Sequence, residues 1–438
     1  MTQRRELPPG WQWARFDQVA RVASNLTDPT GQPTALHIAP NHIESFTGRL
    51  VERSTVGGDG VTSPKHAFEA DQLLYSKIRP YLGKAVIAPA DGLCSADMYP
   101  IATELEVRYL LYWMLSPEFT EEVCQHQGRS VLPKVNQRAL VTVGVPVAPL
   151  QEQRRIADEL ERRLSHVYAA ERSVRLARRL LAAARRAVLC DSIKEHWPSH
   201  WKHMTIADAG ESRLGLQRSP SRHEGSNMKP YLRVANVFEA RIDLADVKEM
   251  HFTTDEERRY LLEPGDILLN EGQSPEFLGR PAMWTGQAHE MYFTNSLIRF
   301  RARAEVLPEW ALLVFRRHMH AGRFRRESRV TTNIAHLALG RFQSVEFPLP
   351  PIDEQRLILA EVERRLSLVD AAERAIEHDL RKVGALRRAL LVSAFSGRLV
   401  HQDPNDEPAA TLLEQIRTQP ARPTATSRSR RPRTEDGA

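Results

Sequence analysis

A long internal repeat constrains this chain more than any other feature. The segment PLQEQRRIADELERRLSHVYAAERSV, which begins at Pro149, returns as PIDEQRLILAEVERRLSLVDAAERAI from Pro351. Solenoid proteins repeat every 20 to 50 residues or so, whereas this segment returns only after about 200 residues. The repeat therefore indicates the duplication of a whole unit, made of a domain and the helix that follows it.

Weaker echoes precede each copy. Trp11 in LPPGWQW parallels Trp201, and DQLLYSKIRPYLGKAVI parallels GDILLNEGQSPEFLGRPAMW, with Gly83 against Gly279. The chain is thus predicted to alternate variable domains with long helices. The predicted segments are a first domain (1–148), a first helix (149–196), a second domain (197–350), a second helix (351–400) and a largely disordered tail (401–438) with a possible short helix in AATLLEQIR.

Both copies of the repeat are predicted to be long helices. A proline stands near the first turn of each, where its missing N–H costs nothing, and acidic residues follow at the positive end of the helix dipole. Apolar residues spaced three or four apart form a seam: Ile156, Leu160, Leu164, Val167, Val174 and Leu181, then Ile358, Val362, Leu366, Val369, Ile376 and Val383. A helix of about 40 residues is roughly 60 Å long, and a narrow seam of that length needs another helix to cover it. We expect the two helices to pair antiparallel; the alternative is that each packs on its own domain.

The variable domains combine short β-rich runs, such as LLYSKI and DILLNEG, with a helix and many Gly and Pro turns. They lack the regular strand–helix alternation of a doubly wound sheet. The predicted fold class is therefore α+β, with two similar mixed α/β domains separated by two long antiparallel coiled-coil helices in a pseudo-twofold internal repeat.

Charge gives a weak indication of a polyanionic partner. The chain carries 61 Lys and Arg against 55 Asp and Glu, for a net charge of +6. Most of this excess lies in the first helix region, and both variable domains are nearly neutral. Within the domains, Arg can pair with phosphate or guanine, and Asn or Gln with adenine. On this chemistry the candidate DNA contacts are Lys77, Arg79, Tyr81, Lys84, Arg129, Lys134, Gln217, Arg218, Gln273, Arg280, Arg326, Arg329, Thr332 and Asn333. The alternative for each is a solvated surface residue with a local acidic partner.

Motifs for chemistry are missing from the sequence. It contains no phosphate-binding G-x-x-x-x-G-K-[ST] loop, no H-E-x-x-H, no G-x-S-x-G and no N-P-P-Y or D-P-P-Y. The three cysteines are far apart, and GGDG at 57–60 is interpreted as a loop tip. We therefore expect no catalytic residues, no cofactor site and no metal site. With no membrane-length apolar run and no signal-peptide pattern, we also expect a cytoplasmic location.

The sequence resembles the specificity subunits of type I restriction-modification systems. The resemblance runs from about Leu7 to Arg417. It rests on the opening LPPGWQW, on the twice-repeated EQRRIADELERRL and EQRLILAEVERRL blocks, and on LRRALLVSAFSGRLVHQDPNDEPAATLLEQIR near the end.

The resemblance implies that residues 1–148 and 197–350 are target-recognition domains, each reading half of a bipartite asymmetric site in double-stranded DNA. The helices would be spacers that fix the half-site separation and dock two modification methyltransferase subunits. Those subunits would bring S-adenosylmethionine and methylate adenine, and restriction subunits would add ATP-driven translocation with Mg²⁺. No contact residue is carried over from the family, so the candidates above rest on residue chemistry.

Two other functions remain open at the level of sequence. The nearly neutral domains would suit a coiled-coil protein–protein adaptor that does not bind DNA. The same architecture would also suit a specificity subunit of another DNA-modifying defence system.

Overall fold

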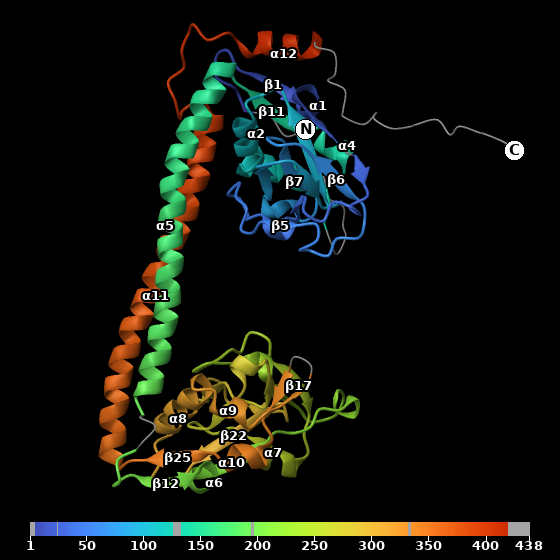
Figure 1. Cartoon of the computed structure of the whole chain (residues 1–438). Coiled ribbons are helices and arrows are strands. Elements are labelled where there is room, and N and C mark those ends of the chain that lie inside the picture. Colours follow the sequence, from blue (N-terminus) through green and yellow to red (C-terminus); the bar gives the residue numbers. More distant parts are fainter. Residues whose placement is uncertain (1–4, 24, 126–132, 194–196, 332–333, 419–438) are drawn as a thin grey trace, which may run out of the picture. The chain divides into compact units, whose positions relative to one another are not determined.

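The computed structural model describes residues 5–23, 25–125, 133–193, 197–331 and 334–418, without the side chains of 329–331. The chain divides into two compact units, one of residues 1–173 and 379–438 and one of residues 174–378. Both divisions fall inside long helices, α5 (Leu150–Asp191) and α11 (Ile352–Phe395) (Figure 1). Each unit therefore contains one variable domain and a portion of both helices.

Unit 1 is built on an antiparallel four-stranded sheet of order β2-β10-β7-β8. A two-stranded sheet, β1-β11, and a five-stranded sheet, β3-β6-β9-β4-β5, complete its strands. The strands are β1 (Gln12–Arg15), β2 (Ala20–Val22), β3 (Leu26–Thr27), β4 (Leu36–Ile38), β5 (Ser54–Thr55), β6 (Lys65–Phe68), β7 (Leu73–Ser76), β8 (Ala85–Ile87), β9 (Gly92–Cys94), β10 (Met98–Thr103) and β11 (Gly144–Val147). Its short helices are α1 (Phe16–Val19), α2 (Val107–Met114), α3 (Pro117–Gln125) and α4 (Gln137–Leu140), with 3-10 turns η1 (Pro40–His42) and η2 (Pro80–Leu82).

Unit 2 repeats this plan with a four-stranded sheet of order β13-β22-β18-β20 and a two-stranded sheet, β12-β25. Its other sheets are β17-β14-β21, β15-β16 and β19-β24-β23. The strands are β12 (Lys202–Thr205), β13 (Gly210–Leu214), β14 (Met228–Leu232), β15 (Val237–Phe238), β16 (Arg241–Ile242), β17 (Lys248–His251), β18 (Ile267–Asn270), β19 (Gly272–Gln273), β20 (Pro281–Met283), β21 (Tyr292–Phe293), β22 (Leu297–Ala302), β23 (Arg329–Thr331), β24 (Ile334–His336) and β25 (Glu346–Leu349). The helices are α6 (Ile206–Ala209), α7 (Thr254–Tyr260), α8 (Pro308–His320), α9 (Arg323–Arg326) and α10 (Leu339–Gln343), and the 3-10 turns are η3 (Pro220–Arg222), η4 (Val234–Asn236) and η5 (Pro275–Phe277).

The two units share a frame and differ around it. The strands β2, β10, β7 and β8 of unit 1 correspond in order to β13, β22, β18 and β20 of unit 2, and β1-β11 corresponds to β12-β25. The remaining strands form one five-stranded sheet in unit 1 and three smaller sheets in unit 2. The α+β class and the internal repeat predicted from the sequence are confirmed.

The two long helices pair antiparallel. In unit 1, Arg387 of α11 lies 3.8 Å from Glu171 of α5, and in unit 2, Arg185 of α5 lies 2.8 Å from Glu373 of α11. The seam residues Ile156, Leu160, Leu164, Val167, Val362, Leu366 and Val369 are buried, while Val174, Leu181, Ile358, Ile376 and Val383 are half-buried. The predicted coiled-coil pair is therefore present, with seven of these twelve seam positions buried and five half-buried.

A buried glutamine joins each long helix to its domain. The Gln153 amide donates to the carbonyl of Ala148 and accepts from the backbone of Glu106. Gln355 donates to the carbonyls of Pro350 and Glu305 and accepts from the backbone of Leu307. Both side chains are fully buried, and this explains why the Gln of the repeated EQ block recurs.

In each EQ block, the glutamate before this glutamine accepts a hydrogen bond from a tryptophan. Glu152 accepts a hydrogen bond from the indole of Trp11 at 2.9 Å, and Glu354 accepts one from Trp201 at 2.6 Å. The weak sequence echo between Trp11 and Trp201 thus marks a real structural equivalence.

The end of the chain packs onto unit 1. Phe395 of α11 makes edge contacts with the rings of Tyr109 and Trp113. Beyond it, Arg155 of α5 pairs with Asp406, and α12 (Ala409–Thr418) begins where the backbone of Ala409 donates to Gly10. The short helix considered for AATLLEQIR is present, and residues 419–438 lie outside the described part. In the described residues, no helix combines the length and apolarity needed to cross a membrane.

Candidate nucleic-acid interface

In unit 1, several predicted DNA contacts lie around the turn that follows β7. The turn η2 places Tyr81 at its centre, and the side chain of Tyr81 is 46% exposed. Arg79 precedes the turn with φ of 48°, in the left-handed region that residues other than glycine rarely adopt. Its side chain is exposed and forms no ion pair with any described residue. A strained, unpaired arginine beside an exposed ring is typical of a binding surface.

Three lysines border this turn. The ammonium of Lys77 lies 5.2 Å from the ring centre of Tyr99, and that of Lys84 donates to the carbonyl of Pro40 at 2.6 Å. Burial, together with nearby Arg79, lowers the pKa of Lys84. Lys134 is paired with Asp97 at 3.1 Å, and its backbone bridges to Ile78. Lys77, Arg79, Tyr81, Lys84 and Lys134 are thus brought together. Arg129 lies outside the described residues.

The equivalent turn of unit 2 is η5, which follows β18 and β19. It presents Phe277, whose side chain is 45% exposed. The Arg280 guanidinium lies 5.5 Å from the ring centre of Phe277 and 4.9 Å from that of Phe238. Burial lowers the pKa of Arg280, an effect that nearby Glu239 opposes. Gln273 precedes the turn, and its side chain accepts from the backbone of Ser274.

A glycine fixes each turn against its domain. Gly83 has φ of 52° and Gly279 has φ of 69°. A Cβ at Gly83 would stand 2.4 Å from the ring of Phe46, and one at Gly279 would stand 2.5 Å from the ring of Phe324. Only glycine satisfies both the backbone angle and the close contact. Phe277 was absent from the sequence candidates, although its alignment with Tyr81 through these glycines could have identified it.

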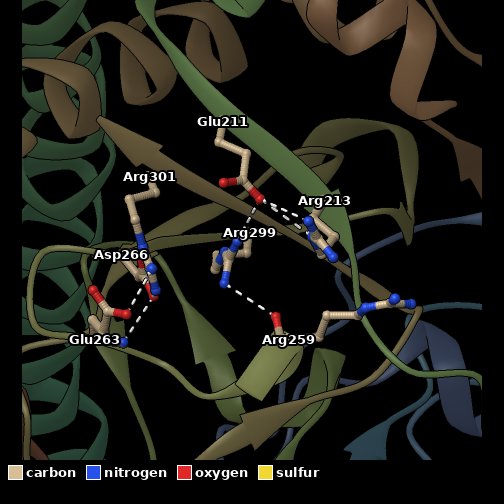
Figure 2. Close-up of polar contacts among 7 residues, drawn as sticks. All are labelled: Glu211, Arg213, Arg259, Glu263, Asp266, Arg299 and Arg301. Carbon is tan, nitrogen blue, oxygen red and sulfur yellow. Dashed lines mark hydrogen bonds and ion pairs between the residues drawn. The ribbon is translucent and has the colours of Figure 1, made fainter. Parts of the chain in front are cut away.

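Other arginines of unit 2 are neutralised internally, as Figure 2 shows. Arg301 forms two hydrogen bonds with the buried carboxylate of Asp266 and one with Glu263. Arg299 donates to Glu211 and to the carbonyl of Arg259, and burial lowers the pKa of Arg299. Arg213 also pairs with Glu211. These arginines hold the sheet together and are not free for a ligand.

The side chain of Arg259 points away from this network (Figure 2). It is exposed, and within the described part of the chain it has no acidic partner. Arg259 is therefore an exposed cation outside the set of candidates that the sequence predicts.

The arginine cluster at 316–329 is divided in the same way. Arg316 pairs with Glu239, and Arg323 pairs with Glu346 and Glu327. Arg317 is buried and donates to the carbonyl of Ile193. Arg326 is exposed on α9. Arg329 lies in β23, but the structure does not describe its side chain. The candidates Thr332 and Asn333 lie outside the described residues.

The last two candidates lie apart from the turn η5 in sequence. Gln217 and Arg218 are exposed in the loop after β13, and the Arg218 guanidinium lies 5.8 Å from the ring centre of Tyr231. Leu216, just before them, bridges to Thr294. Their backbone is therefore anchored beside β21, the strand that pairs with β14.

The GGDG loop tip carries a polar cluster with His37 and His42. Asp59 accepts from His37 Nδ1 and from Ser54, and His42 Nε2 lies 3.6 Å from the same carboxylate. Burial raises the pKa of Asp59, but these hydrogen bonds outweigh it and the pKa lies below its usual range. The backbone of Ala39 donates to His42 Nδ1, so Nε2 carries the hydrogen. In that tautomer the Nε2 hydrogen of His42 faces the Asp59 carboxylate at ion-pair distance, and Nε2 has no lone pair to offer a metal ion.

The chain is thus an internally duplicated α+β protein with one basic, aromatic turn in each unit and two long paired helices. No protein-family model matches it. Its curated relatives are specificity subunits of type I restriction enzymes. It is 42% identical over 196 residues to the EcoDI specificity subunit of Escherichia coli, a match that covers 45% of this chain and 44% of that protein. It is 23% identical over 459 residues to the StySPI specificity subunit of Salmonella potsdam, covering 95% of this chain and 97% of that protein.

A solved structure described as showing complex assembly and conformational transition of the type I restriction-modification system has the same fold. Its TM-score is 0.71 at 20% identity, over 90% of this chain and all of that one. The chain is therefore a relative of type I restriction enzyme specificity subunits and has the fold of that solved structure. The stronger sequence match spans less than half of the relative.

Proposed function

We propose that this chain is the sequence-specific DNA-binding specificity subunit of a type I restriction-modification system. Each unit would read one half of a bipartite, asymmetric site. The observation that carries the proposal is the pair of equivalent turns, η2 and η5, in a chain whose relatives are specificity subunits. Arg79 and Arg280 flank these turns without an ion pair in the described part, whereas the arginines of the neighbouring sheet are neutralised.

The division of roles between contacts follows from the chemistry of DNA. Cations such as Lys77, Arg79 and Arg280 would position the duplex through its phosphates, and base-edge contacts would specify the sequence. For the latter we propose Gln217, Arg218 and Gln273, because amide and guanidinium groups match adenine and guanine edges. The domain surfaces differ while the sheet frame is shared, as two different half-sites would require.

The remaining steps belong to partners in this proposal. Two modification methyltransferase subunits would dock on the paired helices, bind S-adenosylmethionine and methylate adenine. Restriction subunits would use ATP and Mg²⁺ for translocation and cleavage. The chain itself would hold no cofactor and catalyse no reaction, and would act in the cytoplasm.

Selection from a pool of random duplexes tests the proposal with the purified full-length chain. We expect enrichment of two short half-sites at one fixed gap. Co-expression with its modification partner, followed by methylome sequencing, should give adenine methylation at the same bipartite site. A pool that shows no enrichment, with no methylation dependent on this chain, would contradict DNA recognition and favour the protein–protein adaptor.

Salt dependence tests the role of Arg79 in this interface. Each phosphate contact contributes about 0.9 to the slope of log affinity against log salt for duplex DNA. We expect Arg79→Gln to weaken binding of the enriched duplex and to reduce that slope by about one. Arg154→Gln, a matched change of an exposed arginine on α5, should leave the slope unchanged. Equal slopes for both variants would remove Arg79 from the phosphate contacts.

A further inference from the structure

Two aromatic side chains differ from every other aromatic side chain in the molecule. The chain has 14 Phe, 9 Tyr and 7 Trp residues, all within the described residues, and Tyr81 and Phe277 alone are exposed. Their exposed fractions, 46% and 45%, are nearly the same. Single exposed apolar residues need no explanation, but these two occupy equivalent turns of two units whose outer sheets differ. The shared exposure indicates that both rings contact a binding partner and do not serve to stabilise the fold.

The backbone holds each ring in a fixed position. In unit 1, the amide of Gly83 donates to Pro80, its carbonyl accepts from Phe46, and the amide of Arg79 donates to Pro133. In unit 2, Gly279 donates to Asn270, and Arg280 donates to Phe277. Gly83 lies against the half-buried ring of Phe46 and Gly279 against the buried ring of Phe324, so closely that a Cβ at either glycine would clash. The backbone of each turn is therefore preorganised at the position of the exposed ring.

The charged residues beside each ring indicate which kind of binding partner can cover it. Tyr81 lies two residues after Arg79, which is exposed and has no ion pair among the described residues. Phe277 lies beneath the Arg280 guanidinium, which likewise has no ion pair in that part of the chain. An apolar protein surface would gain nothing from these cations. A polyanion that also offers flat apolar faces fits both features, and duplex DNA has this combination.

We infer that Tyr81 and Phe277 are equivalent DNA wedges, each packing its ring against the base stack of one half-site. This inference rests on the proposed function. The adjacent cations would contact the flanking phosphates, and the ring would enter or cover a base step, as apolar wedges do in proteins that deform DNA. The wedge needs an aromatic ring and no hydroxyl, because the two units use Tyr and Phe at the same position.

Four variants of the full-length chain test the inference on the duplex enriched above. Tyr81→Ala and Phe277→Ala should each weaken binding by about tenfold, as expected for one base–aromatic contact. Tyr81→Phe and Phe277→Tyr should bind like the parent chain. Leu26→Ala in unit 1 and Leu357→Ala in unit 2, which remove other exposed apolar side chains, are the matched controls. Thermal unfolding midpoints check that all variants fold.

Two further readouts separate a wedge from a structural or electrostatic role. The alanine variants should keep the salt slope of the parent, because a ring displaces no counterion, whereas Arg79→Gln should reduce it. With 2-aminopurine placed in one half-site at a time, Tyr81→Ala should change the fluorescence at one half-site and Phe277→Ala at the other.

Several outcomes would overturn the inference alone. The first is that the alanine variants bind DNA as well as Leu26→Ala and Leu357→Ala. The second is that neither alanine variant changes the 2-aminopurine fluorescence at either half-site. The third is that the alanine variants bind DNA normally but no longer bind the modification subunit. A parent chain that enriches no duplex contradicts the proposed function instead, so the two failures are distinguishable.

Discussion

At the scale of residues, the partners of a charged side chain decide its role more than its type does. Arg301 and Arg79 are both arginines of a variable domain, yet Arg301 forms an ion pair with Asp266, whereas Arg79 forms none with any residue that the structure describes. For a histidine, burial and hydrogen-bond partners likewise decide whether the ring is charged. His318 of α8 is fully buried and hydrogen-bonded to the carbonyl of Glu346 through Nε2, and its Nδ1 has no partner among the described groups.

This burial predicts a pH dependence of stability. Burial lowers the pKa of His318 to about 4, from 6.5 when exposed, so the folded chain keeps the ring neutral. Because the folded pKa is below the unfolded one, the stabilisation is complete above pH 6.5 and is lost as the pH falls towards 4. The difference amounts to roughly 3 kcal/mol at its full extent.

We expect His318→Gln, whose amide can still donate to Glu346, to lose part of this pH dependence between pH 6.5 and 4. Thermal unfolding midpoints of parent and variant, measured across that range, would show it as converging curves. His289→Gln, a change of an exposed histidine, should run parallel to the parent. A His318→Gln curve parallel to the parent as well would argue against a neutral buried ring.

Residue roles were predictable only in part from the sequence. Lys77, Arg79, Tyr81 and Lys84 are near one another in the chain, so their grouping required no knowledge of the fold. Phe277 lacked such a local signal, because its significance depends on exposure and on equivalence with Tyr81. The ion pairs that neutralise Arg316 and Arg323 join residues far apart in the sequence, and no local pattern could reveal them.

At the scale of elements, the repeated EQ blocks explain how a long helix is fixed to a domain. The seam periodicity predicted both helices and their pairing, because a 3.6-residue period is a local property. The role of Gln153 and Gln355 was hidden, since their partners Glu106, Glu305 and Leu307 lie about 50 residues away in contacts made only on folding.

Removing either glutamine should therefore destabilise its unit. Gln355→Ala leaves the amide of Leu307 and the carbonyls of Glu305 and Pro350 without this partner in a buried site, at a cost of about 2–4 kcal/mol. Gln153→Ala should cost a similar amount in unit 1. Urea unfolding measures the change, and Gln151→Ala, an exposed position on α5, should cost under about 0.5 kcal/mol. A Gln355→Ala chain as stable as Gln151→Ala would contradict the docking role.

At the scale of the whole molecule, the duplication was the most predictable property. Repeated sequence in the helices and the Gly83–Gly279 echo correspond to one shared strand order in both units. The sheets outside this frame were unpredictable, because their short strands, such as β15 and β19, have too few residues for a periodic signal. The helices α5 and α11 belong to both units. Their length is therefore the property to change when a function depends on both variable domains acting together.

The length of the paired helices leads to a prediction about the spacing of the DNA site. If α5 and α11 set the separation of two half-sites, removing residues 174–180 together with 378–384 shortens both helices by seven residues and keeps Glu171 matched with Arg387 and Arg185 with Glu373. Seven residues span about 10 Å of helix, which equals about three base pairs of DNA. We expect the gap in the methylated or enriched site to shorten by about that amount. Leu180→Ala, an exposed change in the same stretch, should leave the gap as it is. An unchanged gap after the paired deletion would mean that the helices hold the domains together without measuring the distance between the half-sites.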